Sequence, residues 1–224
     1  MMHQRKGKQI LIYFFLFILV GSINNIDINK LTLKKVTNIK ILGLNDKESQ
    51  IFLSDIESLN LNNIFFLNEK KIHNMMSNNT TIENYNIFKK YPSDLEIKVK
   101  KTNFLAKMNR NGKTFLIGSN GKLSGINLSN EDLPFIFGQP DIQEFLKFKE
   151  ILDQTKLPYS QIKNLYFFQS KRWDIELKNK ILIKLPKIDV QNSLKNVFIF
   201  LNDNKIRNIN VIDARIKNQI IINE

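Results

Sequence analysis

The sequence predicts an α+β fold, in which one apolar N-terminal helix precedes a mixed block of helices and strands and then a block dominated by strands. Three observations lead to this prediction. One uncharged apolar run, residues 10–23, stands near the amino end, and nothing comparable recurs. Residues 36–99 show strand and helix periodicities in the order strand, helix, helix, strand, strand. From residue 104 onward, short alternating segments recur between turn signals, and two helical patterns interrupt them.

The apolar run is predicted to be a membrane anchor or the core of a signal peptide. Basic residues precede it, and such residues hold the amino end of a first apolar helix in the cytoplasm, so the rest of the chain should lie across the membrane. Roughly 14 residues at about 1.5 Å each span only about 21 Å, which is short for a hydrocarbon core near 30 Å. Both alternatives stay open from these residues alone, because Val20 and Ser22 also offer the small-residue pattern of a cleavage site. In an anchor, the residues facing lipid would be Ile10, Leu11, Tyr13, Phe14, Phe15, Leu16, Phe17, Ile18, Leu19 and Val20.

The composition indicates a folded exported part without the usual catalytic residues. Of the 224 residues 42% are hydrophobic, enough for an ordinary core, and there is no cysteine for a disulfide, a thiol nucleophile or a thiolate metal site. Because His3 and His73 are the only histidines, a histidine metal site or a Ser-His-Asp triad lacks residues. The net charge of +13 would favour nucleic acid, but the lysines are scattered rather than collected on one helix between aromatic residues. The sequence therefore predicts no enzyme, no cofactor site and no nucleic-acid surface.

Two local patterns that resemble sites are interpreted as ordinary structure. Residues 118–125 superficially resemble a phosphate loop, but they lie between two strand-like segments, which favours a hairpin turn. The acidic pairs Asp94 with Glu96 and Asp174 with Glu176 have strand spacing. Apolar residues alternate with them, so both pairs are predicted on the solvent face of half-buried strands.

In the first block, residues 36–41 form a strand that ends at Gly43. Asn45 begins a helix through a capping-box spacing with Glu48, and Asn68 begins a second, shorter helix. A turn at residues 91–94 separates strands at 82–88 and 95–99. The predicted apolar stripes are Ile51, Phe52, Ile56 and Leu59 in the first helix and Ile72, Met75 and Met76 in the second.

The second block is richer in strands. Its predicted elements are strands at residues 104–108, 114–117 and 123–126, a helix from Asp141, a meander at 165–169, 173–177 and 181–185, a helix from Asp189, and last strands at 209–215 and 219–222. Trp173, the only tryptophan, lies in the meander. A core position is the simpler interpretation of this residue, and a binding role is the alternative.

In this order of motifs the chain resembles the FtsQ/DivIB family of single-pass cell-division proteins. The runs VTNIKILGLN at residues 36–45 and KYPSDLEIKV at 90–99, with the two capped helices between them, are similar to that family's POTRA domain. Leu133-Pro134 followed by Gly138, RWDIEL at 172–177, IKLP at 183–186 and IDAR at 212–215 are similar, in order, to signatures of its β domain. Where the family usually turns the meander with Asn-Gly, this chain has Asn179-Lys180, which removes the residue most comfortable at positive φ, though Asn179 can adopt it.

The resemblance implies that the apolar run is kept as an anchor. It implies a cytoplasmic leader at residues 1–9, a transmembrane anchor at 10–28, a POTRA domain at 30–101 and a β domain at 102–224. The implied function is that of a non-catalytic divisome scaffold in the bacterial inner membrane, with its bulk in the periplasm and concentrated at the division septum. Its implied partners are FtsB-type and FtsL-type proteins and other divisome components, linked to septal peptidoglycan synthesis, with no cofactor and no small-molecule substrate. The alternatives are another POTRA-containing interaction or translocation module and an exported enzyme.

The main partner site is predicted on the last strand. Residues 216–222 favour β structure, with no following segment to cover them, and an uncovered strand edge exposes N–H and C=O groups that another chain can complete. The resemblance implies the same arrangement, because the family's last strand receives an extended segment of FtsB, which pairs with FtsL through a coiled coil. Ile220 and Ile222 share one face and Ile221 points to the other, so one face can pack inward while the other meets the partner. The predicted partner-binding residues are Ile216, Asn218, Gln219, Ile220, Ile221 and Ile222, and Trp173 marks the alternative site.

Overall fold

A computed structural model describes residues 3–23, 35–125, 132–202 and 209–223. Residues 24–28 of the predicted anchor and Ile126 of a predicted strand lie outside the described residues. Grouped by the contacts between residues, the chain falls into two compact units. The first takes in residues 1–42, 46–71 and 87–97, and the second takes in residues 43–45, 72–86 and 98–224. The segment boundaries expected from the sequence stay predictions.

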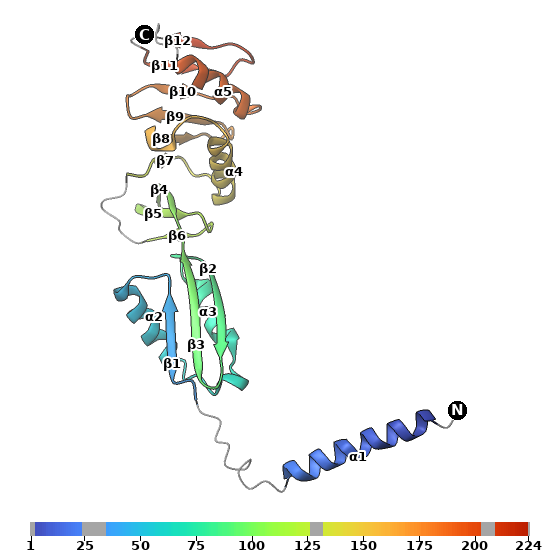
Figure 1. Ribbon diagram of the computed structural model, residues 1–224. Coiled ribbons are helices and arrows are strands. Elements are labelled where there is room, and N and C mark those ends of the chain that lie inside the picture. The colour runs from blue at the N-terminus through green and yellow to red at the C-terminus, as the bar shows by residue number, and fades with distance from the viewer. Residues whose placement is uncertain (1–2, 24–34, 126–131, 203–208, 224) are drawn as a thin grey trace. The chain divides into compact units, whose positions relative to one another are not determined.

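The helix α1 (His3–Ile23) contains the apolar run, as predicted (Figure 1). Its large apolar side chains from Ile10 to Val20 are all exposed. Among the residues that the structure describes, no helix combines the length and the apolar character needed to cross a bilayer.

The first sheet has three strands, β1 (Asn38–Leu42), β2 (Ile82–Lys90) and β3 (Asp94–Lys101), in the order β1-β3-β2 (Figure 1). Between β1 and β2 the chain forms α2 (Asp46–Ser58), the 3-10 turn η2 (Ile64–Phe66) and α3 (Glu69–Asn78). The predicted order of strand, helix, helix, strand, strand is confirmed. The turn η2 is an addition, because three residues are too few for a periodicity to indicate them.

Local features fix the ends of these elements. Asn68 caps α3 as predicted, since its Oδ1 accepts a hydrogen bond from the backbone N–H of Lys70 at 3.1 Å. Gly43 follows β1 with φ +96°, and a Cβ there would lie 1.9 Å from the carbonyl oxygen of Val99, so the position requires glycine.

The apolar stripe predicted for α2 is narrower than expected. Phe52 and Ile56 are buried, but Ile51 is exposed. The reason is that Ile51 lies one position from Phe52, about 100° around the helix axis. In α3, Ile72 and Met76 are fully buried.

The second sheet has nine strands in the order β12-β11-β10-β9-β8-β7-β4-β5-β6 (Figure 1). Three neighbouring pairs are parallel, β10 with β11, β4 with β7 and β7 with β8, and the other five are antiparallel. The predicted α+β class with a mostly antiparallel second sheet is confirmed. The bounds are β4 (Phe104–Arg110), β5 (Lys113–Gly118), β6 (Leu123–Ser124), β7 (Phe135–Phe137), α4 (Ile142–Asp153), η3 (Tyr159–Gln161), β8 (Ile162–Phe167), β9 (Trp173–Leu177), β10 (Leu182–Lys184), α5 (Val190–Leu201), β11 (Val211–Asp213) and β12 (Ile221–Asn223).

The core of the second unit is built on one face of this sheet. Residues directly opposite one another on neighbouring strands form an apolar row across seven strands, and the members inside the row are at most 2% exposed. The row runs Ile222, Ile212, Ile183, Ile175, Leu165, Ile136, Met108. Phe145, Phe148 and Leu152 of α4 and Leu194 and Val197 of α5 belong to the same apolar cluster. Both helices therefore cover the face that carries the row.

The hairpin predicted at residues 118–125 is confirmed. The backbone N–H of Gly118 donates to the carbonyl oxygen of Lys122 at 3.0 Å, and the turn joins the antiparallel strands β5 and β6. The Lys122 ammonium donates to the backbone carbonyls of Ser77 and Asn79. This lysine therefore serves to hold the turn in place.

The solvent-face prediction for the acidic pairs is wrong for two of the four residues. Asp174 is 3% exposed, and Glu96 is also buried. Each has a cation beside it, Arg172 for Asp174 and Lys90 for Glu96. A carboxylate that is paired and hydrogen-bonded can be buried, so alternation along the strand alone does not place it in solvent.

In the turn of the meander the positive φ belongs to Lys180, at +72°, although Asn179 could also have adopted it. The Asn179 Oδ1 instead accepts a hydrogen bond from the backbone N–H of Ile181 at 3.3 Å. Asparagine commonly bonds the backbone two residues on in this way, which leaves the left-handed position to the next residue.

Candidate partner-binding edge

The last three strands bring the predicted partner-binding residues to one edge of the second sheet. β10 and β11 run parallel, with α5 between them in the chain, and β12 folds back antiparallel on β11. In this register Ile221 lies opposite Asp213, and Ile222 lies opposite Ile212. Within the described part of the chain, β12 ends the strand order, so one of its edges is unpaired. An edge of this kind presents backbone donors and acceptors to a further strand.

A tight turn between β11 and β12 takes up part of the predicted strand. The backbone N–H of Gln219 donates to the carbonyl oxygen of Ile216 at 3.1 Å, and Asn218 has φ +60°. Asparagine tolerates this left-handed conformation better than most residues. The strand therefore begins at Ile221, two residues later than predicted, and residues 216–219 present a turn.

The isoleucines at this edge differ in exposure. Ile216 and Ile221 are more than half exposed, and Ile220 packs against the core cluster. Ile222 is 42% exposed. It lies on the core face opposite Ile212, but as a member of the outermost described strand it has a paired strand on one side only. The edge thus exposes one isoleucine on each face of β12.

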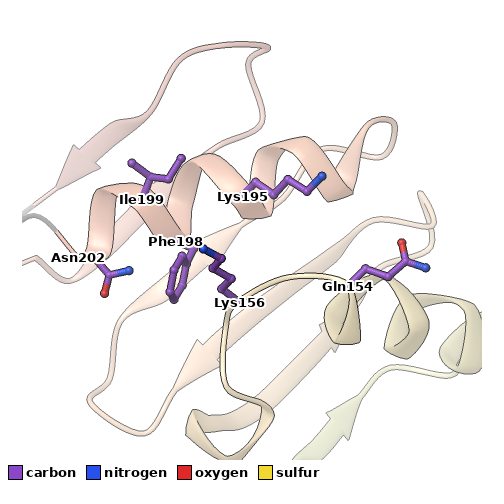
Figure 2. A pocket seen from close by; sticks show the side chains of 6 residues that line it. All are labelled: Gln154, Lys156, Lys195, Phe198, Ile199 and Asn202. Carbon is purple, nitrogen blue, oxygen red and sulfur yellow. The ribbon is translucent and has the colours of Figure 1, made fainter.

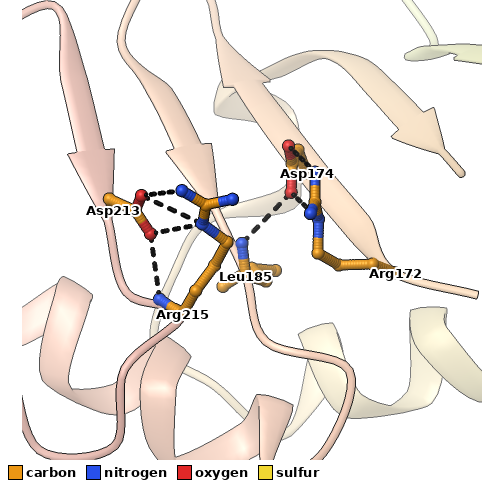
Figure 3. A network of polar contacts seen from close by, with 5 residues as sticks. All are labelled: Arg172, Asp174, Leu185, Asp213 and Arg215. Atoms are coloured by element: carbon orange, nitrogen blue, oxygen red, sulfur yellow. Dashed lines mark hydrogen bonds and ion pairs between the residues drawn. The ribbon is translucent and has the colours of Figure 1, made fainter. Parts of the chain in front are cut away.

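A row of charged residues crosses the last strands on the face opposite the core (Figure 3). Asp213, Lys184 and Asp174 are direct cross-strand neighbours. Asp213 accepts hydrogen bonds from Nε of Arg215 at 2.8 Å and from its backbone N–H at 3.1 Å. The side-chain hydrogen bond from Arg215 lowers the pKa of Asp213 below its ordinary value. The pair therefore stays ionised at neutral pH and holds the arginine at the start of the turn.

Asp174 is the buried member of this row. Its Oδ1 accepts hydrogen bonds from Nε of Arg172 and from the backbone N–H of Leu185, both at 3.2 Å (Figure 3). The first comes from its own strand, and the second fixes the chain just after β10. Asp174 therefore acts as a link between β9 and the segment that leads into α5.

Glu176, two residues further along β9, is also held by its neighbours. It accepts hydrogen bonds from Oη of Tyr166 at 2.6 Å and from Nδ2 of Asn164 at 2.9 Å. The Tyr166 hydrogen bond lowers the pKa of Glu176, and the same bond raises the pKa of Tyr166. A carboxylate stabilised in its ionised form is suited to structure rather than to proton donation at neutral pH.

The structure places Trp173 in the core, which confirms the simpler of the two interpretations. Its indole stacks on Phe148 with ring centroids 4.6 Å apart and contacts Phe167 at 4.8 Å. A side chain covered in this way offers no surface to a partner. The sequence missed the charged row beside it, although Arg172 and Asp174, two residues apart on one strand, share a face and could have indicated it.

Within the described part of the chain, cavities lie near the last helix. One, about 460 Å³, lies between the end of α4 and the outer side of α5 (Figure 2). It is lined by Gln154, Lys156, Lys195, Phe198, Ile199 and Asn202. Another, about 240 Å³, has Arg215 and Asn218 in its wall, so it borders the turn into β12.

Comparison with known proteins gives a consistent result. The family model described as cell division protein FtsQ/DivIB, C-terminal, matches residues 104–215, and this range ends just before the turn into β12. The chain is 27% identical over 202 residues to cell division protein FtsQ of Rickettsia bellii, covering 84% of this chain and 72% of the relative. It is 25% identical over 202 residues, with the same coverage, to cell division protein FtsQ of Rickettsia conorii. It is 23% identical over 163 residues to cell division protein FtsQ of Bradyrhizobium diazoefficiens, covering 71% of this chain and 48% of the relative.

Proposed function

Because the chain belongs to the FtsQ/DivIB family of cell division proteins, we propose that it serves division as a non-catalytic scaffold. In this role it binds FtsB-type and FtsL-type partners and other divisome components in the periplasm and links them to septal peptidoglycan synthesis. It contributes binding energy and geometry and changes no covalent bond. Residues 30–101 serve as a POTRA domain and residues 102–224 as the β domain.

The observation that carries this proposal is the unpaired edge of β12. An extended segment of an FtsB-type partner adds to this edge as a further strand, and its backbone supplies the missing hydrogen-bond partners. The added strand also covers Ile222 on one face and Ile221 on the other, both of which are exposed without it. Backbone pairing supplies affinity, and the two isoleucines favour apolar side chains on both faces of the added segment.

The proposed scaffold is held in the inner membrane by α1, with its amino end in the cytoplasm and the larger part of the chain in the periplasm. The exposed apolar side chains from Ile10 to Val20 support this placement, because a continuous apolar surface of this kind is unfavourable in water. Mass spectrometry of the membrane-extracted protein should find the residues before Asn24. A mature chain that begins near Ile23 and is soluble in the periplasm would show that the segment is a cleaved signal peptide.

A pair of proline substitutions tests the edge. Successive residues of an antiparallel strand direct their backbone N–H groups to opposite edges, so one of Ile221→Pro and Ile222→Pro removes an outward donor and the other removes a donor to β11. We expect the substitution that removes the outward donor to abolish FtsB-type binding while hydrogen exchange of the β11 amides stays unchanged. Ile199→Ser, at an exposed isoleucine of α5, is the control and should bind as the wild type does.

Two further measurements complete the test. Deletion from Asn218 onward should abolish binding of the FtsB-type partner in the same assay. Depletion of the protein should give cells that elongate without dividing. Normal septation after depletion would refute the scaffold role. Full binding by the deletion variant would refute this location of the partner site.

A further inference from the structure

An aromatic patch lies at the end of the three-stranded sheet where the chain leads into β1. Lys35 forms an isolated antiparallel bridge with Asn63, next to η2. The backbone N–H of Thr37 donates to the carbonyl oxygen of Ser93 at 3.0 Å, in the turn between β2 and β3. The entry of the chain, η2 and this turn therefore gather at one end of the three-stranded sheet (Figure 1).

Three aromatic side chains at this end point into solvent. Phe65 is 54% exposed, Phe66 72% and Tyr91 61%, and the Phe65 and Tyr91 ring centroids are 4.9 Å apart. We call Phe65, Phe66 and Tyr91 the aromatic patch. Neighbouring exposed aromatic rings of this size mark an interaction surface.

The backbone that carries the patch is fixed. Ile64 and Leu67, on either side of the two phenylalanines, are buried, so the core holds η2 at both ends. The Asn63 Oδ1 accepts a hydrogen bond from the backbone N–H of Phe66 at 3.1 Å. Phe65 and Phe66 are therefore presented outward by a supported turn.

The net charge around the patch is positive. One carboxylate, that of Asp94, lies just after the turn that carries Tyr91 and accepts a hydrogen bond from Nδ2 of Asn38. The carboxylates of Glu69 and Glu96 are ion-paired with Lys89 and Lys90, so these four residues largely compensate one another. Further cations are exposed close to the patch in the sequence or across the bridge, namely Lys35, Lys70 and Lys71. Such a surface complements phosphate groups.

The length of chain between α1 and the patch restricts what can meet it. Ile23 ends α1, and Lys35, shortly before β1, forms its bridge beside η2. The connecting residues 24–34 can span at most about 40 Å even when fully extended. With α1 in the bilayer, the patch is always within that distance of the lipid surface, so it reaches lipid without a separate diffusional encounter.

We propose that the aromatic patch docks on the phospholipid surface, with its rings at the level of the headgroups and Lys35 against their phosphates. Aromatic rings prefer this interfacial level, and lysines add attraction to anionic lipid. The inference rests on the proposed placement of α1 in the membrane. Docking gives the first unit a fixed orientation on the bilayer, which a tether alone does not supply.

The absence of cysteine allows the proposal to be tested on the full chain with single spin labels. Asn62→Cys places a label beside the patch and leaves all three aromatic residues in place. Ile51→Cys, 54% exposed on α2, is the matched control, and Phe14→Cys reports separately whether α1 lies in the bilayer. The labelled proteins are reconstituted in vesicles of phosphatidylglycerol and phosphatidylcholine, and the access of oxygen and of a polar nickel chelate to each label is measured.

We expect the Asn62 label to show higher oxygen access and lower chelate access than the Ile51 label, more strongly in phosphatidylglycerol. When Phe65, Phe66 and Tyr91 are replaced by serine, the ratio of oxygen access to chelate access at the Asn62 label should return to the value at the Ile51 label. The same ratio at the Phe14 label should be unchanged. A fully aqueous Asn62 label with a lipid-embedded Phe14 label would overturn the docking but leave the anchor intact. Loss of access to both reagents at Asn62 would show cover by protein, either residues 24–34 or a second copy, and would also overturn it. An aqueous Phe14 label would instead refute the placement of α1.

Discussion

Replacing Asp174 with alanine should destabilise the second unit by about 1–4 kcal/mol, and the structure divides this cost into two parts. The larger part comes from the backbone N–H of Leu185, which is buried and would lose its acceptor, at about 1–3 kcal/mol. The smaller part comes from Arg172, whose side chain is 25% exposed and can turn to water, so its loss contributes about 1 kcal/mol or less.

The variant Asp174→Asn separates the two parts. An asparagine keeps a carbonyl oxygen where Oδ1 accepts from Leu185, and it removes the charge and the Oδ2 acceptor that face Arg172. We therefore expect it to cost about 1 kcal/mol, since the net value of a partly exposed ion pair is small. Arg172→Gln should cost a similar amount, because it removes the same pair from the other side.

The assay follows from the position of Trp173. It is the only tryptophan and lies in the core next to Asp174, so its fluorescence during urea unfolding of the full chain in detergent reports this unit alone. Changes in the urea midpoint at constant slope convert to free energy. If the asparagine variant loses as much stability as the alanine variant, the bond to Leu185 is not the main contribution and the division of the cost into these two parts is refuted.

Three further perturbations have defined outcomes. The pKa of Asp213 is lowered in the folded chain, so the stability that its carboxylate contributes is complete above the ordinary pKa of 3.8 and is lost as the pH falls below that value. Asp213→Asn should therefore lower the urea midpoint at pH 7, and the difference in midpoint between variant and wild type should shrink in acid. Gly43→Ala should destabilise by about 2 kcal/mol or more, because the added Cβ meets the Val99 carbonyl at a positive φ, and faster hydrogen exchange of the β1 amides would report it. Lys180→Gly should stabilise by about 0.5–1 kcal/mol by relieving a left-handed lysine, and an unchanged or lower Trp173 midpoint would contradict this.

Local patterns predicted most of the elements because each depends on residues close in sequence. The alternation of residues 173–177 predicts β9 with both of its ends, and Asn68 predicts the start of α3. The order of the strands within the sheet, by contrast, cannot be predicted from residues close in sequence. β7 lies between β4 and β8 and runs parallel to both, an arrangement that depends on long-range packing and leaves no local pattern.

The features of the candidate site that local patterns did not predict have the same origin. The exposure of Ile222 depends on which strand stands next to β12, and the burial of Asp174 depends on the N–H of Leu185, which a neighbouring strand brings to it. Away from this site, Phe65 and Phe66 drew no prediction, because they lie on a three-residue turn that is too short to have a period. Periodicity describes one element at a time, whereas these features arise where elements meet.

The parallel pairing of β10 with β11 also sets the order in which the edge can form. A hairpin such as β9 with β10 joins residues that are close in the chain, but β11 reaches β10 only after α5 has been placed. Closing that longer loop costs more entropy, so the pairing forms late in folding. β12 has its described neighbour in β11 and is ordered only afterwards. If a partner adds to β12 as proposed, it would therefore bind only chains in which β11 is already paired with β10.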